Sequence, residues 1–520
     1  MRPFVITLAV LAMLAPSAWF FWQARDAPHL GTFEDDSLYL VAGKSLAEGK
    51  GYRILSLPGE PYQTKYPPLY PLILAAVWKL DGNFPANMSK VMLVQWVLWL
   101  AFLATAALML WSLKPLSTAS KWASLVFIAV SPPFVYLGLS VMPETLFATL
   151  CMTSILLANV SSWTETRRAL LSGACAACAV LTKVAGIPLI VAGFLYWLLK
   201  KNYKRAALFV APACLAIAGW AYWCFMHRLK VNDINLIYYT DYINYYFGTT
   251  TLADLLKVFT GNISALAESA GLLAVFYLVR DPFSLFLHIL IGVVVLAIGL
   301  CFIAKIRPNF IIIFVFLFLL QNIIWNFRPD VRFIFPVLLF LSAGFFWGLE
   351  VTNKRLFSKE LRVYVYSLVT ISLIAWNLLQ TTAYLRSFIP ESRRIWNRLK
   401  CASDWISEYT SPSDDFITYR DVDLFLLSGR HGLRPVREPI PYYYENTAAL
   451  EKPLRNIAQY AATSWFEFLL WDKSDFLDDS YLGDPERKEK ILAEIKDIVL
   501  ERELCGVRIY RFTRSNSSPD

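Results

Sequence analysis

Long apolar runs follow one another through the first three quarters of the chain. After a first run within 3–22, they lie at roughly 91–113, 121–139, 143–160, 168–182, 185–199, 205–226, 282–304, 309–326, 331–349 and 362–386. A membrane-spanning helix needs about 17–25 such residues, so this pattern predicts about eleven transmembrane helices. We expect the first run to be an uncleaved span, because it continues through the aromatic residues at 19–22.

Charged residues between these runs predict the orientation of the helices. With the N-terminus inside, every second predicted loop is rich in Lys and Arg, as the positive-inside rule requires. This agreement holds only if the short run at 66–80 does not cross the membrane. Its three prolines and its tyrosines favour a helix that lies at, or dips into, the outer interface.

Three polar segments are then expected outside the membrane: 23–90, 227–281 and 387–520. We predict a transmembrane domain over 1–386, whose first outer loop, 23–90, carries juxtamembrane helices. The tail over 387–520 alternates between helix-like and strand-like stretches, which is typical of a small α/β domain outside the membrane. The expected fold is therefore mainly α, with a small α/β domain at the C-terminus.

The composition agrees with a membrane protein. Of the 520 residues, 57% are hydrophobic and only 17% are charged, and the mean hydropathy is +0.46. A soluble chain of this length needs far more polar surface, so soluble, disordered and fibrous classes are excluded. Because loop lysines and arginines account for the net charge of +9, it does not indicate a nucleic-acid partner.

Asp35 and Asp36 are the strongest candidates for chemistry. They follow Glu34 at the head of an amphipathic helix, a short distance past the first span. Either aspartate could simply cap that helix. The apolar face of the helix would, however, rest on the membrane and hold the carboxylates at a fixed depth, which suits a general base or a metal ligand.

Four further features lie at predicted outer turns. They are Lys65 in QTKYPP, Glu144 in VMPETLF, Lys183 in LTKVAG, and Arg328 with Arg332 in NFRPDVRF. Each has a structural alternative: an interfacial anchor, a helix cap or a local ion pair. Because acids and cations converge at one membrane face, together they predict a site for an anionic, lipid-borne substrate.

The order of these motifs resembles that of the GT-C superfamily of glycosyltransferases. More closely, it resembles the branch with the protein O-mannosyltransferases, the lipid A aminoarabinose transferases and the RgtA/B/C/D-like enzymes. The motifs that carry the resemblance are Asp35-Asp36, Tyr39, Lys65, Tyr66-Pro67-Pro68, MPETLF, LTKVAGIPL, RPDVRFIFP and the tail segment VDLFLLSGR. The second acid is Asp36, where many members have Glu.

The resemblance implies transfer of a monosaccharide from a polyprenyl-phosphate-linked donor to an extracytoplasmic acceptor, with inversion. Asp35 would be the general base, and Asp36 would orient it or contact the acceptor. Lys65, Lys183, Arg328 and Arg332 would bind the donor phosphate. Tyr39, Tyr66 and Glu144 would contact the substrate. Because cations are already in place for the leaving phosphate, no obligatory divalent metal and no other cofactor are expected.

Two other functions stay open at this point. A transporter or flippase of lipid-linked sugars would also handle such lipids, although transporters place their charges near the midplane and often contain inverted repeats. A non-catalytic assembly or sensor protein would use the outer domain alone. A bacterial inner membrane is the expected location, and the four histidines show no spacing typical of metal ligands. The sequence does not decide whether Cys401 and Cys505, both in the tail, form a disulfide.

Overall fold

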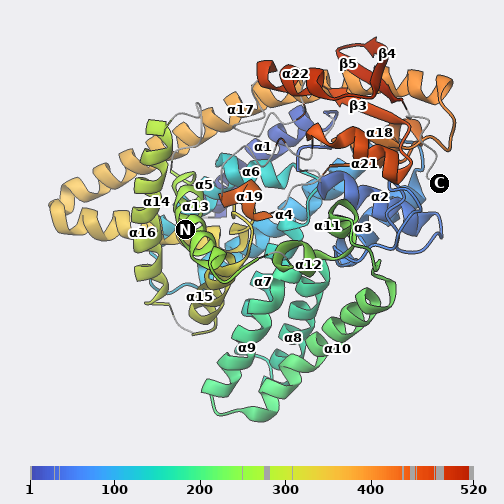
Figure 1. Ribbon diagram of the computed structural model, residues 1–520. Coiled ribbons are helices and arrows are strands. Elements are labelled where there is room, and N and C mark those ends of the chain that lie inside the picture. The colour runs from blue at the N-terminus through green and yellow to red at the C-terminus, as the bar shows by residue number, and fades with distance from the viewer. Residues whose placement is uncertain are drawn as a thin grey trace.

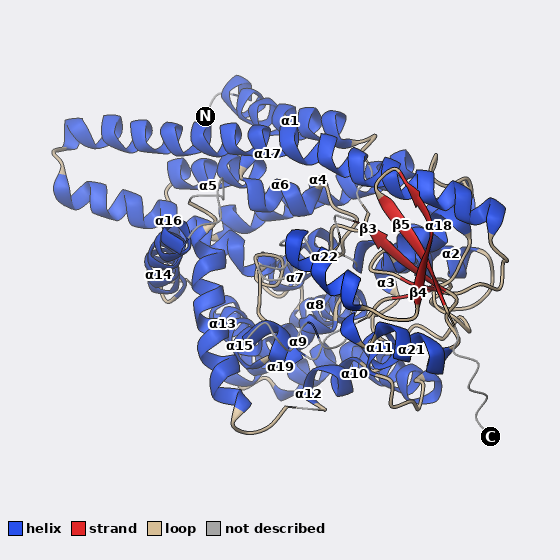
Figure 2. Ribbon diagram, turned by 45° about the horizontal axis from the view of Figure 1, so that its top comes forward, coloured by secondary structure: helices blue, strands red, loops and turns tan. Residues whose placement is uncertain are grey.

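The computed structural model shows a helical protein with one small sheet (Figures 1 and 2). It describes residues 3–27, 30–33, 35–248, 250–274, 282–306, 309–435, 439–444, 451, 454–472, 475 and 485–513. Glu34 lies outside these residues. The mainly α fold with a small α/β tail is therefore confirmed.

Most of the helices before the tail follow the apolar runs of the sequence, and the others lie in the segments 23–90 and 227–281 that are expected outside the membrane. Their bounds are α1 (Pro3–Ala24), α2 (Asp35–Ala47), α3 (Leu69–Leu80), α4 (Met88–Ser112), α5 (Thr118–Val130), α6 (Pro132–Gly138), α7 (Glu144–Leu157), α8 (Glu165–Thr182), the 3-10 turn η1 (Val184–Gly186), α9 (Ile187–Leu199), α10 (Tyr203–His227), α11 (Ile234–Thr240), α12 (Tyr242–Phe247), α13 (Asp254–Gly271), α14 (Pro282–Ile303), α15 (Asn309–Ile324), α16 (Phe335–Leu356) and α17 (Lys359–Tyr409).

Five of the described helices are long and apolar enough to cross a membrane. They are α4, α10, Phe283–Ile303 within α14, α16 and α17. A sixth span results if α5 and α6 count as one. The two helices are bent by 55° relative to each other, because Pro132 and Pro133 cannot donate the backbone hydrogen bonds that would continue α5. This is a multi-pass membrane protein, but the predicted count of eleven spans is not confirmed, because α7, α9 and α15 are short.

Helix α3 corresponds to the run at 66–80 that is expected not to cross. It has 12 residues, and at 1.5 Å per residue it is much shorter than the hydrocarbon core of about 30 Å. It packs closely on α2 at Gly43, where an added Cβ would lie 2.9 Å from the Cβ of Leu74. The length of α3 therefore agrees with a helix that stays at the interface.

The C-terminal segment forms a five-stranded sheet with short helices around it. Its elements are β1 (Phe416–Ile417), α18 (Asp421–Ser428), β2 (Gly432–Leu433), α19 (Pro439–Tyr444), α21 (Ile457–Ser464), β3 (Phe468–Asp472), α22 (Pro485–Glu494), β4 (Ile498–Leu504) and β5 (Val507–Phe512). The strand order is β2-β1-β3-β5-β4. β1 runs parallel to β2 and β3, whereas β5 pairs antiparallel with β3 and β4.

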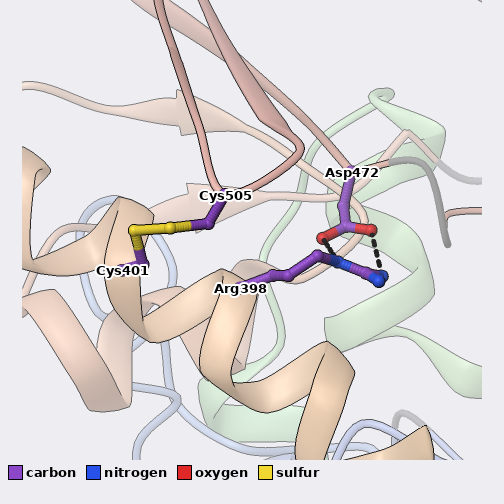
Figure 3. Close-up of a disulfide and its surroundings, with 4 residues drawn as sticks. All are labelled: Arg398, Cys401, Asp472 and Cys505. Carbon is purple, nitrogen blue, oxygen red and sulfur yellow. Dashed lines mark hydrogen bonds and ion pairs between the residues drawn. A yellow bond between two sulfur atoms is a disulfide. The ribbon is translucent and has the colours of Figure 1, made fainter.

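Helix α17 joins the two parts of the chain without a break. It runs along the top of Figure 1 and ends beside the sheet, so the predicted domain boundary after residue 386 falls inside it. A disulfide between Cys401 and Cys505 attaches α17 to the turn between β4 and β5 (Figure 3). Nearby, Nη2 of Arg398 on α17 lies 3.0 Å from Oδ1 of Asp472 on β3. The sheet is thus fixed to the end of a long helix that contains a membrane span.

The apolar core consists of two large clusters of buried side chains. One lies within the helix bundle and includes Phe102, Phe134 and Leu338. The other includes Leu38 of α2 together with Leu469 of β3. Because this second cluster contains a residue of the first outer loop, Leu38, and a residue of the sheet, Leu469, the C-terminal sheet packs against that loop.

Candidate active site

Asp35 stands in the first turn of α2, and its carboxylate faces groups from distant parts of the chain. Oδ1 accepts a hydrogen bond from the hydroxyl of Tyr66. Oδ2 lies 3.3 Å from Nη1 of Arg332, which precedes α16. The side chain is 19% exposed, so it is held by the protein while it stays accessible from one side.

These neighbours determine the protonation state of Asp35. Burial alone would raise its pKa, but Arg332, Lys65 and Lys183 stabilise the carboxylate, as does the hydrogen bond from Tyr66. The balance holds the pKa of Asp35 below its ordinary value. Asp35 is therefore an ionised carboxylate at neutral pH, surrounded by positive charge.

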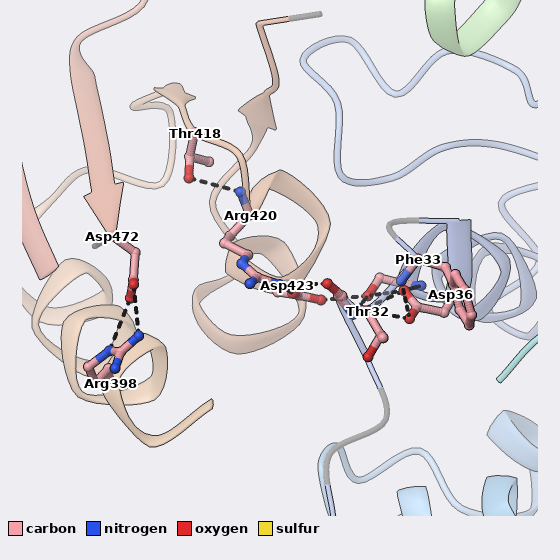
Figure 4. A network of polar contacts seen from close by, with 10 residues as sticks. Thr32, Phe33, Asp36, Arg398, Thr418, Arg420, Asp423 and Asp472 are labelled. Atoms are coloured by element: carbon pink, nitrogen blue, oxygen red, sulfur yellow. Dashed lines mark hydrogen bonds and ion pairs between the residues drawn. The ribbon is translucent and has the colours of Figure 1, made fainter. Parts of the chain in front are cut away.

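Asp36 points away from this cluster and into its own loop. It is fully buried, and its carboxylate accepts hydrogen bonds from backbone N–H groups (Figure 4). The donors are Gly31, Thr32, Phe33 and Ser37, at 2.7 to 3.2 Å. Burial and the charge of Asp423 nevertheless raise the pKa of Asp36 to about 7. Asp36 thus orders the loop that carries Asp35.

Lys65 enters the site from the segment that follows α2. Its side chain is buried, and Nζ lies 3.4 Å from the ring centroid of Tyr238 and 5.1 Å from that of Tyr66. Its charge reaches Asp35, because it contributes to lowering the pKa of that carboxyl group. Aromatic faces thus hold a cation next to the acid.

Glu144, the first residue of α7, forms an ion pair with Lys183, which directly follows α8. Nζ of Lys183 donates to Oε1 of Glu144 at 2.7 Å. Glu144 is 1% exposed, and its second oxygen, Oε2, has no hydrogen-bond partner among the described residues. A buried carboxylate oxygen of this kind can accept a hydrogen bond from a bound hydroxyl group.

Arg332 lies between the acids and links them. Besides the contact with Asp35, its Nε is 3.4 Å from Oδ2 of Asp330, and its guanidinium lies 4.7 Å from the ring centroid of Phe333. The ring of Phe333 also lies 4.8 Å from Nζ of Lys183. Arg332 and Lys183 therefore both lie close to one aromatic ring.

Tyr39 completes the wall behind Asp35, while Arg328 lies elsewhere. The ring of Tyr39 is buried, 4.7 Å from that of Tyr66 and 5.4 Å from that of Tyr70. Arg328 pairs instead with Glu268 on α13, at 3.0 Å, and is about half exposed. The structure thus brings most of the predicted site residues together: Asp35, Tyr39, Lys65, Tyr66, Glu144, Lys183 and Arg332.

Two groups of residues at the site are absent from the sequence-based prediction. One is the aromatic wall of Tyr238 and Tyr242, for which the tyrosine-rich run at 238–246 is a signal. The other is the start of α18, where Asp423 reaches the loop of Asp36. The motif VDLFLLSGR marks the segment, but nothing in it indicates this contact.

The arrangement has the chemistry of a proton acceptor next to an anion site. Asp35 can accept a proton, and Lys65, Lys183 and Arg332 can stabilise a negative charge that develops close by. Within the described residues no group of three or more His, Cys, Asp or Glu side chains has the geometry of a metal site. The expectation that no divalent metal is obligatory stays a prediction.

Comparison with known proteins finds solved structures that share this fold. The chain is similar over its full length, and over the full length of the other chain, to ArnT from Cupriavidus metallidurans bound to undecaprenyl phosphate, with 12% identity and a TM-score of 0.57. It is also similar to the oligosaccharyltransferase AglB from Archaeoglobus fulgidus in complex with an inhibitory peptide and a dolichol-phosphate. That match covers 92% of this chain and 70% of the other, with 12% identity and a TM-score of 0.53.

No family model matches the sequence, and no curated protein matches it either. The structural similarity shows that the chain shares the fold of these proteins, which agrees with the GT-C fold that the motifs predict. At 12% identity it shows the fold alone.

Proposed function

We propose that this protein is an inverting glycosyltransferase that moves a monosaccharide from a polyprenyl-phosphate-linked donor to an acceptor outside the cytoplasm. One observation carries the proposal: the ionised carboxylate of Asp35 lies next to Arg332, with Lys65 and Lys183 close by. A base for the acceptor and cations for the leaving phosphate are the two requirements of the reaction. The solved GT-C structures, of which one holds undecaprenyl phosphate and another a dolichol-phosphate, support the choice of donor.

The proposed reaction is a single displacement at the anomeric carbon. The acceptor oxygen gives its proton to Asp35 and forms the new bond to the sugar from the face opposite the phosphate. The bond between the anomeric carbon and the phosphate oxygen breaks, and its electron pair leaves with polyprenyl phosphate. Lys65, Lys183 and Arg332 stabilise the charge that grows on that oxygen.

In this proposal the remaining residues have supporting roles. Tyr39 and Tyr66 line the site and Tyr66 holds Asp35, while the second oxygen of Glu144 accepts a hydrogen bond from a substrate hydroxyl. Asp36 orders the loop and does not touch substrate. We assign Arg328 no contact with the phosphate, because it pairs with Glu268.

Arg332 is shared between Asp35 and Asp330 when the site is empty. A donor phosphate that binds Arg332 neutralises its charge and weakens its hold on Asp35. Binding of the donor therefore makes Asp35 more basic before the acceptor arrives. No divalent ion is needed in this scheme, since three cationic side chains face the phosphate.

The Cys401–Cys505 disulfide supports the proposed location. Disulfides persist in oxidising compartments, so the C-terminal sheet belongs outside the cytoplasm. The alternation of basic loops puts the same side of the protein outside. We propose a bacterial inner membrane protein with an extracytoplasmic C-terminal domain over 387–520.

Turnover of the donor tests the function. Purified protein is incubated with a panel of polyprenyl-phosphate sugars and candidate acceptors, and release of polyprenyl phosphate is followed. We expect release with one donor, loss of release in Asp35→Asn, and no loss in Asp26→Asn, a matched exposed acid just before the loop. Movement of an intact donor across a vesicle membrane, with no release, would contradict the proposal and favour a transporter.

A further inference from the structure

The loop that carries Asp35 is closed around the carboxylate of Asp36. Four backbone N–H groups of this loop point at that carboxylate, so the described residues 31–33 and 35–37 are held around one side chain. Asp35 is one of these residues, and its own N–H donates to the carbonyl oxygen of Phe33 at 2.6 Å. Anything that displaces the loop displaces Asp35 with it.

The start of α18 contacts the outer side of this loop at two points (Figure 4). The hydroxyl of Ser37 donates to Oδ1 of Asp423 at 2.5 Å. Nη1 of Arg420 donates to the carbonyl oxygen of Gly31 at 2.7 Å. Nη1 of Arg420 also lies 3.7 Å from Oδ2 of Asp423, so the two side chains form an ion pair. The backbone N–H of Arg420 donates to Oγ1 of Thr418, which fixes the arginine relative to β1.

Gly31 shows how closely the two segments approach. Its φ of +70° lies in the region that favours glycine, and an added Cβ would lie 2.3 Å from both Nη1 of Arg420 and Oδ2 of Asp423. A side chain at this position would displace the side-chain ends of Arg420 and Asp423 from the loop. Ser37 and Asp423 are both buried, so their hydrogen bond is shielded from water.

We propose that Arg420 and Asp423 are positioning residues for Asp35, through which the C-terminal domain sets the orientation of the base. They act from a segment 385 or more residues away in sequence, whereas Lys65 and Lys183 belong to other segments of the chain. The proposal rests on the proposed function, because it concerns the base of that reaction. It gives the C-terminal domain a part in the chemical step.

This role has a measurable signature. A displacement of about 1 Å at a reacting group can lower a rate by about 100-fold. The cations that bind the phosphate come from other segments, so donor affinity is nearly unchanged. We therefore expect Asp423→Ala and Arg420→Met to lower kcat by about 10- to 100-fold, with a KM for the donor within about twofold of the wild-type value.

Tyr239→Phe is the matched control. The hydroxyl of Tyr239 donates to Oδ2 of Asp421 at 2.8 Å, also at the start of α18, but it does not reach the loop of Asp36. This variant removes one buried hydrogen bond between the same two parts of the protein. We expect it to keep the kcat and the KM of the wild type.

Hydrogen–deuterium exchange gives a second readout that needs no substrate. The amides of 31–33 and 35–37 are expected to exchange faster in Asp423→Ala and Arg420→Met, and at the wild-type rate in Tyr239→Phe. If both variants fold and keep the wild-type kcat and exchange, the positioning role is overturned and the proposed function stands. A lower yield alone, with wild-type kcat in the folded fraction, would also overturn it. An inactive wild-type protein would overturn the proposed function, and the positioning role with it.

Discussion

Replacing Arg332 by Gln should move the pH dependence of activity in a defined direction. Arg332 lies 3.3 Å from the carboxylate of Asp35 and lowers its pKa, against the effect of burial. Without the guanidinium, burial dominates and the pKa of Asp35 rises. Because Asp35 must be ionised to accept a proton, activity at acidic pH is lost first, and the acidic limb of the profile moves to higher pH.

The distance gives the size of this shift. Two unit charges 3.3 Å apart attract each other by about 5 kcal/mol at an effective dielectric constant of about 20. That is an upper limit, because Asp35 is partly exposed and Lys65 and Lys183 still act on it. Opposite charges at such distances change carboxylate pKa values by about 1 to 3 units. We expect the acidic limb to move upward by the same amount.

The assay is release of polyprenyl phosphate between about pH 4 and 9, with each profile of kcat/KM normalised to its own maximum. Normalisation separates the pH effect from the loss of phosphate binding, which lowers the whole profile. Arg328→Gln is the control, since Arg328 pairs with Glu268 and does not contact Asp35. An active Arg332→Gln variant whose acidic limb coincides with that of the wild type would refute the assignment of Asp35 as the base.

Three further predictions concern single contacts. Asp35→Asn keeps the shape of the side chain but cannot accept the proton, so kcat should fall by about 100- to 10,000-fold. The melting temperature in detergent should stay close to that of the wild type. A loss of kcat below tenfold would argue against a general base. Lys183→Met leaves the buried carboxyl group of Glu144 without its ion-pair partner, and should lower the free energy of unfolding by about 3 kcal/mol. Adding Glu144→Gln should restore stability without activity, which thermal melting and donor turnover can separate. Replacing both Cys401 and Cys505 by Ser opens a loop with a sequence separation of 104 and should cost about 2–5 kcal/mol of stability; unchanged melting of the C-terminal domain would contradict this.

Loop charge was enough to predict that the acids and cations lie on one side of the membrane. Once the basic loops had been placed inside, Asp35, Lys65, Lys183 and Arg332 fell on one side, and the structure brings all four together. The membrane supports such inference because it limits each polar turn to one of two faces. It does not determine distances within a face, which is why Arg328 was grouped with a site that it does not reach.

Contacts between side chains that are far apart in the chain could not be predicted from the sequence. Lys183 has no acidic neighbour along the chain, yet it pairs with Glu144 in space. The two aspartates at the head of α2 look equivalent in sequence, whereas the backbone directs Asp35 toward Arg332 and encloses Asp36 within the loop. Side chains that are adjacent on a helix point in different directions, and only the packed structure decides which of them faces the site.

The number of membrane spans was also beyond reach from hydropathy alone. Each long apolar run became helical, but proline broke one of them between α5 and α6, and α15 has only 16 residues. Short helices in a bundle can lie among other helices without crossing the bilayer by themselves. Apolar length therefore located the helices but did not determine how many of them span.

A structure of the protein in lipid nanodiscs with undecaprenyl phosphate would test the central claim most directly. The account predicts phosphate density within hydrogen-bonding distance of at least two of Lys65, Lys183 and Arg332, with Asp35 released from Arg332 and facing the space next to the phosphate where the sugar of a donor would lie. Density for the phosphate at another place on the protein, with the Asp35–Arg332 contact intact, would contradict the account.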